Sequence, residues 1–156
     1  MRKNKVEYHE SSITKVDFGE SVKIVKPVNL YGCRIGDYSF IGPFVEIQKN
    51  VEIGSKCKIQ SHSFICELVS IGDNVFIGHG VMFINDLFKK GVPASGNKNL
   101  WKKTNIGDNV SIGSNSTILP VNICSDVVIG AGSVVTKNLS KPGLYLGNPA
   151  KFVKEF

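Results

Sequence analysis

The chain has 156 residues, of which 42% are hydrophobic and 21% are charged, and it carries a formal net charge of +6. This composition fits one ordinary globular domain with a hydrophobic core. No apolar run approaches the roughly 20 residues of a membrane span, and the polar start MRKNKVEYHESS lacks the apolar stretch of a secretory signal. We therefore expect a cytoplasmic protein without membrane insertion. No motif places basic residues on one face with interleaved aromatic ones, so nucleic acid is not an expected partner.

A six-residue repeat runs through most of the chain. Weak repeat positions occur at Phe18, Ile24 and Leu30. From Ile35 the chain reads IGDYSF, IGPFVE, IQKNVE, IGSKCK, IQSHSF, ICELVS, IGDNVF and IGHGVM, so that consecutive hexads begin with isoleucine. The register slips by one residue twice, before Ile35 and before Ile123, which we interpret as local turn adjustments. Glycine is common in the second position, where we expect backbone angles that a Cβ would penalise.

The period of six predicts the fold. It fits neither a long helix, whose apolar spacing is near 3.6, nor the alternation of one long strand. It fits short strands joined by tight turns, with one large apolar side chain of each hexad pointing inward. Three strands then complete a triangular coil, and successive coils hydrogen-bond at strand spacing, ~4.8 Å. The sequence thus predicts an all-β, single-stranded parallel β-helix of nearly six coils.

The repeat is interrupted once. It stops after FIND (83–86) and resumes with IGDNVS at Ile106. The intervening residues are polar, include Gly, Pro and Asn, and predict an extruded loop; a long loop in a compact repeat domain is usually functional. The predicted parts of the single domain, 1–156, are a lead-in (1–17), the first coils (18–86), the loop (87–105), the last coils (106–139) and a C-terminal tail (140–156).

Three polar residues are predicted to meet at the base of the loop. Since three hexads make one coil, residues 18 apart in an unbroken stretch of repeat stack on the same face. Glu67 and Asn85 are 18 apart, and Asp86 follows where the chain leaves the prism. Asn and Asp also suit a simple turn, but with Glu67 stacked beneath them we favour a substrate site.

The repeat, the single loop, the run IGAGSVVTKNL (129–139) and the closing GNPAK (147–151) resemble the hexapeptide-repeat acyltransferases. The resemblance covers Phe18 to Phe156 and implies a left-handed prism, a homotrimer, and acetyl-CoA bound as co-substrate between subunits. The stretch 59–86 is most similar to the N-acetyltransferases of nucleotide-linked 3-amino sugars. This implies acetylation of the 3-amino group of a dTDP-3-amino-3,6-dideoxyhexose (Fuc3N or Qui3N) for surface polysaccharide, as in O-antigen or S-layer glycan biosynthesis.

The same resemblance implies roles for individual residues. Related 3-amino-sugar acetyltransferases hold the acceptor with residues that match Glu67, Asn85 and Asp86. Relatives that acetylate hydroxyls often carry a loop histidine, and 87–105 contains none. This favours an amine acceptor, because a neutral amine attacks a thioester without full deprotonation by a base. His79 is a further catalytic candidate, as a base or as a contact to the pantetheine arm.

Two sets of residues are candidates for binding coenzyme A. Gly113 and Ala131 lie at prism edges where, in the family, backbone groups bond pantetheine, and small residues permit close approach. Lys137, Asn148 and Lys151 lie in the matching C-terminal stretch, where the lysines can meet the adenosine phosphates as point charges.

Several alternatives stay open. Trp101 in the loop covers the acyl-CoA, stacks on a nucleotide base, or pins the loop to a neighbouring subunit. A zinc enzyme of the γ-carbonic-anhydrase type is disfavoured, because His62 and His79 are 17 apart and too few ligands exist, so no metal is expected. The cysteines form no C-x-x-C pair and are expected to be reduced. A β-helix scaffold or binding protein, and acetylation of a UDP-linked amino sugar or of a sugar hydroxyl, are the competing functions.

Overall fold

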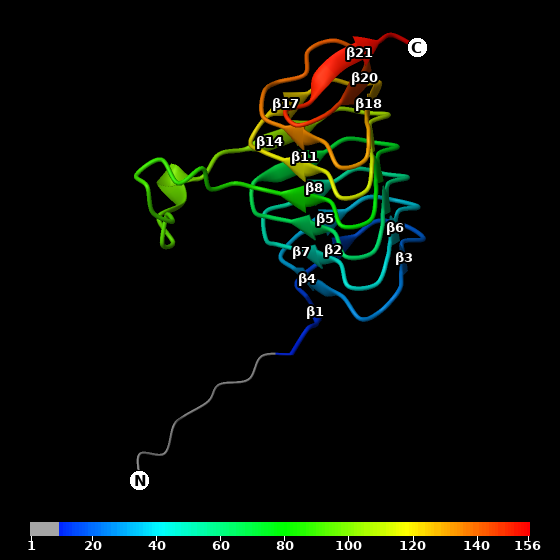
Figure 1. Cartoon of the computed structure of the whole chain (residues 1–156). Helices are drawn as coiled ribbons and strands as arrows, with labels where there is room; N and C mark the ends of the chain where they lie inside the picture. The colour runs from blue at the N-terminus through cyan, green and yellow to red at the C-terminus, as the bar shows by residue number, and fades with distance from the viewer. Residues whose placement is uncertain (1–9) are drawn as a thin grey trace.

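The computed structural model describes residues 10–156; residues 1–9, which include most of the predicted polar start and His9, lie outside the described part. The described chain is a triangular prism wound from short strands, with one loop projecting from its side (Figure 1). A short 3₁₀ helix, η1 (Lys98–Leu100), lies in that loop. This all-β solenoid confirms the predicted class and is consistent with a left-handed coil. Nothing within 10–156 forms a helix long and apolar enough to cross a bilayer.

Three sheets, here named A, B and C, form the faces of the prism, and each coil adds one strand to each sheet. Sheet A contains β1 (Ile13–Thr14), β4 (Asn29–Tyr31), β7 (Glu46–Ile47), β10 (Phe64–Ile65), β13 (Met82–Phe83), β16 (Thr117–Ile118) and β19 (Val134–Val135). Sheet B contains β2 (Asp17–Phe18), β5 (Arg34–Ile35), β8 (Glu52–Ile53), β11 (Val69–Ile71), β14 (Thr104–Ile106) and β17 (Asn122–Ile123). Sheet C contains β3 (Lys23–Ile24), β6 (Phe40–Ile41), β9 (Lys58–Ile59), β12 (Phe76–Ile77), β15 (Ser111–Ile112), β18 (Val127–Ile129), β20 (Gly143–Leu146) and an antiparallel β21 (Lys151–Lys154).

The prism has about seven coils, one more than the sequence predicts, since sheet A alone has seven strands. At one end Ile13 pairs with Leu30, so a coil begins inside the predicted lead-in. That coil packs against the core through Val16 and Val22 instead of an Ile-Gly hexad. At the other end β20 continues sheet C beside β18. The two extra segments were missed because they lack the repeat that marks the other coils.

The first residue of each hexad fills the interior. Side chains alternate along a strand, so Ile59 is 0% exposed whereas its neighbour Lys58 faces solvent. Fully burying a side chain of this size stabilises the fold by ~1.5–3 kcal/mol. Small fifth-position residues complete the core, and Ser63 donates a hydrogen bond to the carbonyl of Gly78 at 2.8 Å. Isoleucines with no exposed surface are Ile35, Ile41, Ile47, Ile59, Ile65, Ile77, Ile112 and Ile118.

The tight turns place two backbone constraints at different hexad positions. The fourth residue takes the left-handed region, as at Lys56 (φ 57°) and Asn74 (φ 57°). The second-position glycine does not; instead, a Cβ on Gly54 would lie 2.6 Å from the carbonyl carbon of Gly72 in the next coil. The expectation that these glycines supply unusual backbone angles was therefore wrong. At these glycines the neighbouring coil lies too close for a Cβ, whereas the hexads with Gln48, Gln60 and Cys66 in the second position accommodate a side chain.

Three corners join the sheets, and we name them AB, BC and CA after the faces they connect. The AB corner comprises 15–16, 32–33, 48–51, 66–68, 84–103, 119–121 and 136–138. The BC corner comprises 19–22, 36–39, 54–57, 72–75, 107–110 and 124–126. The CA corner comprises 25–28, 42–45, 60–63, 78–81, 113–116 and 130–133. Both one-residue slips and the loop lie on the AB corner. Paired residues Asn29 and Glu46 are 17 positions apart across a slip, whereas Glu46 and Phe64 are 18 apart, which confirms the slips as local turn adjustments.

Gly54→Ala is expected to destabilise the protein by roughly 1–3 kcal/mol, the range for overpacking a filled interior, because the methyl group would meet the backbone of Gly72. Lys56→Gly is the matched control in the same turn, and relieving its positive φ should change the free energy of unfolding by less than ~1 kcal/mol. Denaturant unfolding followed by circular dichroism measures both. Equal destabilisation by the two variants would contradict this explanation of the second-position glycines.

Candidate active site at the base of the loop

The three predicted acceptor residues lie together on the AB corner. Phe64 of β10 pairs with Met82 of β13, so the turn that carries Glu67 lies one coil beneath the start of the loop. Asn85 Nδ2 donates a hydrogen bond to the backbone carbonyl of Glu67 at 3.2 Å. The 18-residue spacing therefore brings these residues into contact, and Asp86 follows directly at the loop entrance.

Both carboxylate oxygens of Asp86 organise the loop. Oδ1 accepts a hydrogen bond from the amide of Phe88 at 2.9 Å, and Oδ2 accepts one from the amide of Ala94 at 2.7 Å. The amide of Lys102 donates to the carbonyl of Asn85 at 2.9 Å and closes the neck of the loop. A carboxylate has about four acceptor positions. Asp86 therefore turns the chain and can still accept a hydrogen bond from a ligand.

Glu67 is the one charged residue among those described, 10–156, that is buried, with 6% of its surface exposed. Its Oε2 accepts a hydrogen bond from Lys98 Nζ at 2.8 Å, and its Oε1 lies 3.7 Å from Lys49 Nζ. The hydrogen bond to the Glu67 carboxylate raises the pKa of Lys98 above its usual value. A buried carboxylate thus gathers two ammonium groups at the base of the loop.

The sequence reasoning missed both lysines. Lys49 stands 18 residues before Glu67, so the spacing that relates Glu67 to Asn85 would have found it. Lys98 lies in the loop, where no repeat fixes its position. Its ammonium is 5.6 Å from the ring centroid of Trp101, so Trp101 contacts the residue that ties the loop to Glu67. This contact with Lys98 of the same chain differs from all three roles predicted for Trp101, each of which involves a ligand or a neighbouring subunit.

His79 lies on a different corner from the acceptor residues. It belongs to the CA corner, and sheet A separates it from Asn85 within one chain. Its Nδ1 is 2.8 Å from Ser61 Oγ in the coil beneath, and its ring is exposed. His62, on the same corner, occupies a left-handed turn position (φ 64°) and stacks on Phe44 with centroids 4.8 Å apart.

The candidate cofactor residues Gly113 and Ala131 occupy successive coils of the CA corner, toward the C-terminal end from His79. A Cβ on Gly113 would strike the backbone nitrogen of Ala131. Coil stacking therefore suffices to explain the glycine, although Ala131 itself is exposed and its edge is accessible.

The candidate phosphate-binding residues all lie at the C-terminal end of the prism and are exposed. Lys137 belongs to the AB corner, after β19. Asn148 precedes β21, and Lys151 begins that strand. Gly113 and Ala131 are adjacent on the CA corner, and the segment 147–150, which contains Asn148, hydrogen-bonds to Ser133 and Val134 beside them. Lys137 lies apart from them, on the AB corner.

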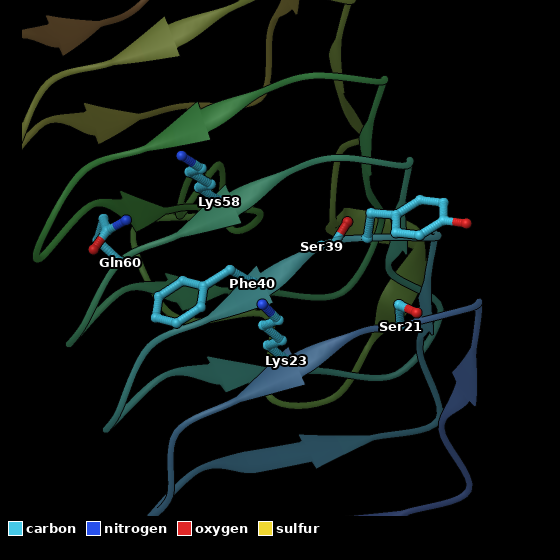
Figure 2. A pocket seen from close by; sticks show the side chains of 7 residues that line it. Ser21, Lys23, Ser39, Phe40, Lys58 and Gln60 are labelled. Atoms are coloured by element: carbon cyan, nitrogen blue, oxygen red, sulfur yellow. The ribbon is translucent and has the colours of Figure 1, made fainter.

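A groove of about 680 Å³ lies on the outer face of sheet C, away from the loop (Figure 2). Phe40 sits between Lys23 and Lys58 on adjacent strands, and aliphatic lysine stems commonly cover apolar surface in this way. None of the candidate site residues lines it. The lining residues are Ser21, Lys23, Tyr38, Ser39, Phe40, Lys58 and Gln60.

Within 10–156, His, Cys, Asp and Glu side chains form no group of three or more that could hold a metal ion. The four cysteines are free. Burial raises the pKa of Cys33 to about 11 and that of Cys66 to about 12, so both thiols stay protonated near neutral pH. Cys66, although it is adjacent to Glu67, is therefore not a nucleophile.

Comparison with known proteins identifies the class. Residues 32–67 match the family described as bacterial transferase hexapeptide (six repeats), and residues 68–84 and 103–137 match the hexapeptide repeat of succinyl-transferase. Together these matches cover more than half of the chain. The chain therefore belongs to the hexapeptide-repeat transferases.

The sequences of individual curated relatives match most of this chain over part of their own length. The bifunctional protein GlmU of Streptococcus uberis is 34% identical over 127 residues, which is 80% of this chain and 27% of that protein. GlmU of Prochlorococcus marinus is 29% identical over 88% of this chain and 32% of its own length. The chain thus spans about a third or less of these curated relatives.

Solved structures share the fold more completely. AntD, an N-acyltransferase from Bacillus cereus that was solved as a point variant with dTDP and coenzyme A, has a TM-score of 0.76 at 24% identity, covering 92% of this chain and 85% of AntD. The hexapeptide-repeat acetyltransferase VCA0836 from Vibrio cholerae, solved with acetyl coenzyme A, has a TM-score of 0.66 at 26% identity, covering 80% of this chain and 70% of that protein.

Asp86→Ala is expected to loosen the loop, because two backbone amides lose a charged acceptor. Hydrogen exchange at Phe88 and Ala94 should accelerate by about tenfold or more, since a hydrogen bond to a charged group contributes ~1.5–3 kcal/mol. Mass spectrometry of deuterium uptake measures this change. Asp108→Ala removes a carboxylate that accepts from the amide of Asp73 at 2.8 Å on the BC corner, and it should leave the loop unaffected. Unchanged loop exchange in Asp86→Ala would contradict the assigned contacts.

Proposed function

We propose that this chain transfers an acetyl group from acetyl-CoA to the amine of a nucleotide-linked amino sugar, most specifically the 3-amino group of a dTDP-3-amino-3,6-dideoxyhexose, in the cytoplasm and for surface polysaccharide. The observation that carries this proposal is the stack of Glu67 beneath Asn85 and Asp86 at the base of a loop without histidine. The stack offers hydrogen-bonding groups that can orient an amine. A strong base of the kind that a hydroxyl acceptor needs is not part of it.

The chemistry requires an oriented neutral amine. Asn85 and the remaining acceptor positions of Asp86 hold the nitrogen while its lone pair attacks the thioester carbonyl of acetyl-CoA. The C–N bond forms and the C–S bond breaks, and the proton released by the nitrogen passes to the departing CoA thiolate. The carboxylate of Asp86 stabilises the positive charge that develops on the nitrogen during attack. This sequence of steps needs no general base with a raised pKa.

The choice of a dTDP sugar rests on the resemblance of 59–86 to the 3-amino-sugar N-acetyltransferases. AntD, which shares the fold, was solved with dTDP and coenzyme A together. This precedent supports a site on this fold that accepts both a nucleotide and the cofactor. A UDP-linked amino sugar is the alternative acceptor.

The proposed active unit is a homotrimer with each site between two copies. Within one chain, Asn85 and Asp86 lie on the AB corner, whereas His79, Gly113 and Ala131 lie on the CA corner. These corners are the two edges of sheet A. A ring of copies that turn sheet A inward brings the AB corner of one beside the CA corner of the next. That arrangement unites the acceptor residues with the candidate cofactor residues.

The outward-facing side chains support sheet A as the interface. Phe64 and Val134 project from its outer face and are half-buried in the single chain, and Met82 beside them is 39% exposed. The polar residues Glu46 and Thr117 stand in register with them on the same face. Burying such apolar surface against another copy is favourable. The outer face of sheet B, in contrast, consists of polar residues, namely Asp17, Arg34, Glu52, Ser70, Asn105 and Asn122.

Incubation with acetyl-CoA and a dTDP-linked 3-amino sugar is expected to release free thiol. Asp86→Asn and Asn85→Ala should each lower kcat/KM by at least about tenfold, equivalent to ~1.4 kcal/mol of transition-state stabilisation. Asp17→Asn, an exposed Asp-to-Asn change on sheet B, is the control. Absence of thiol release with every dTDP- and UDP-linked 3-amino and 4-amino sugar would refute the function, and parental activity in both site variants would refute the site.

Met82→Glu is expected to dissociate the trimer and abolish activity, because it places a charge in an apolar interface. Phe76→Glu is the matched control on sheet C, since both parent side chains are 39% exposed. Light scattering coupled to size-exclusion chromatography gives the mass of each variant. Dissociation by Phe76→Glu but not by Met82→Glu would contradict an interface on sheet A.

A further inference from the structure

The ionic cluster at the base of the loop contains two lysine ammonium groups but one buried carboxylate. One lysine would neutralise Glu67, yet Lys98 and Lys49 both approach it, at 2.8 Å and 3.7 Å. Among residues 10–156, neither lysine is paired with any other carboxylate. The cluster therefore carries a net positive charge beside the proposed acceptor site.

The two ammonium groups are held in place but remain accessible. The Glu67 side chain is 8% exposed, whereas those of Lys49 and Lys98 are 49% and 50% exposed. An ammonium group has three N–H donors, and one from each lysine suffices for the contact to Glu67. The remaining donors are free to meet an anion from the solvent side. A buried acid that fixes two half-exposed lysines is a suitable arrangement for binding phosphate oxygens.

We propose that Lys49 and Lys98 bind the diphosphate of the nucleotide-linked acceptor, and that Glu67 acts as a positioning residue for these two lysines instead of contacting the sugar. The proposal rests on the function proposed above and assigns the part of the site that recognises the nucleotide. It reassigns Glu67 from the acceptor group to the support of the lysine pair.

The spacing of the coils suits this assignment. Glu67 lies one coil below Asn85, a step of ~4.8 Å, and both ammonium groups are held at the level of Glu67. A 3-amino hexose carries its amine at C3 and its diphosphate at C1, two positions apart on the sugar ring, so the two groups lie within a few ångströms of each other. With the amine at Asn85 and Asp86, the first phosphate therefore falls near the lysine pair.

The positions of the lysines along the prism axis are also consistent with binding of the diphosphate by Lys49 and Lys98. Lys49 lies two coils toward the N-terminal end from Asn85 on the AB corner, and Lys137 lies two coils toward the C-terminal end. The nucleotide of the acceptor would then extend one way and the phosphates of coenzyme A the other. The two polyanions meet only at their reacting ends, which keeps their charges apart.

The test measures binding of dTDP and of UDP to the whole chain by calorimetry. Lys49→Gln and Lys98→Gln should each weaken binding by about tenfold, because each removes a charge-assisted hydrogen bond. Lys98→Arg keeps the charge and should bind within about threefold of the parent. Lys58→Gln, which alters the groove on sheet C shown in Figure 2, is the matched control and should have no effect.

Kinetics separate phosphate binding from a merely structural role. Lys49→Gln and Lys98→Gln should raise KM for the nucleotide sugar while kcat and KM for acetyl-CoA stay near the parent values. A collapsed loop would instead lower kcat. Nucleotide binding that is unchanged in both variants, or that is weakened only by Lys58→Gln, overturns this proposal but leaves the acetyltransfer intact. A parent chain that binds neither nucleotide and acetylates no nucleotide sugar overturns both.

Discussion

Close stacking of the coils is the constraint on which the rest of the structure depends. Successive coils approach so closely that a Cβ on a second-position glycine such as Gly54 would collide with the backbone of the next coil. The same closeness lets each coil complete the hydrogen bonding of the next. On the BC corner, Asp73 accepts from the amide of Ser55 at 2.7 Å, and Asp108 accepts from the amide of Asp73 at 2.8 Å. Side chains of one coil thus satisfy the turn amides of its neighbour.

The candidate site is built by the same stacking. On the AB corner, Lys49, Glu67 and Asn85 follow one another at 18-residue steps, and each contacts the next. On the BC corner such ladders satisfy turn amides. On the AB corner the ladder ends where the chain departs into the loop, and its last members, Asn85 and Asp86, are half-buried. The contacts between successive coils therefore supply, on the AB corner, a row of polar groups that can bind a ligand.

Under the proposed function, the position of the loop leaves a single chain with an incomplete site. The loop leaves from one edge of sheet A, while the residues expected to contact pantetheine lie along the other edge. Nothing inside a rigid prism can bring the two edges together. In the proposed trimer a neighbouring copy brings them together across the outer face of sheet A, where Phe64, Met82 and Val134 project. The proposed function therefore couples assembly to activity through the geometry of the prism.

Much of the fold and part of the candidate site could be predicted from the sequence. The repeat period is a local property, so it can be recognised without knowledge of tertiary contacts. The period predicts the class of fold, the loop, and the contact between Glu67 and Asn85. It failed at the end coil that begins at Ile13, which packs without an Ile-Gly hexad. It also failed for Lys98, whose contact with Glu67 depends on how the loop folds.

The sequence did not predict the reason for the second-position glycines, because a collision between coils is not visible in a single hexad.

The most direct measurement of the central claim is a crystal structure of the protein with coenzyme A and a dTDP-linked 3-amino sugar. The sugar amine is predicted within hydrogen-bonding distance of Asn85 or Asp86, with the diphosphate toward Lys49 and the cofactor along the CA corner of the adjacent copy. A sugar bound in the sheet C groove, or with its amine remote from the AB corner, would contradict the account.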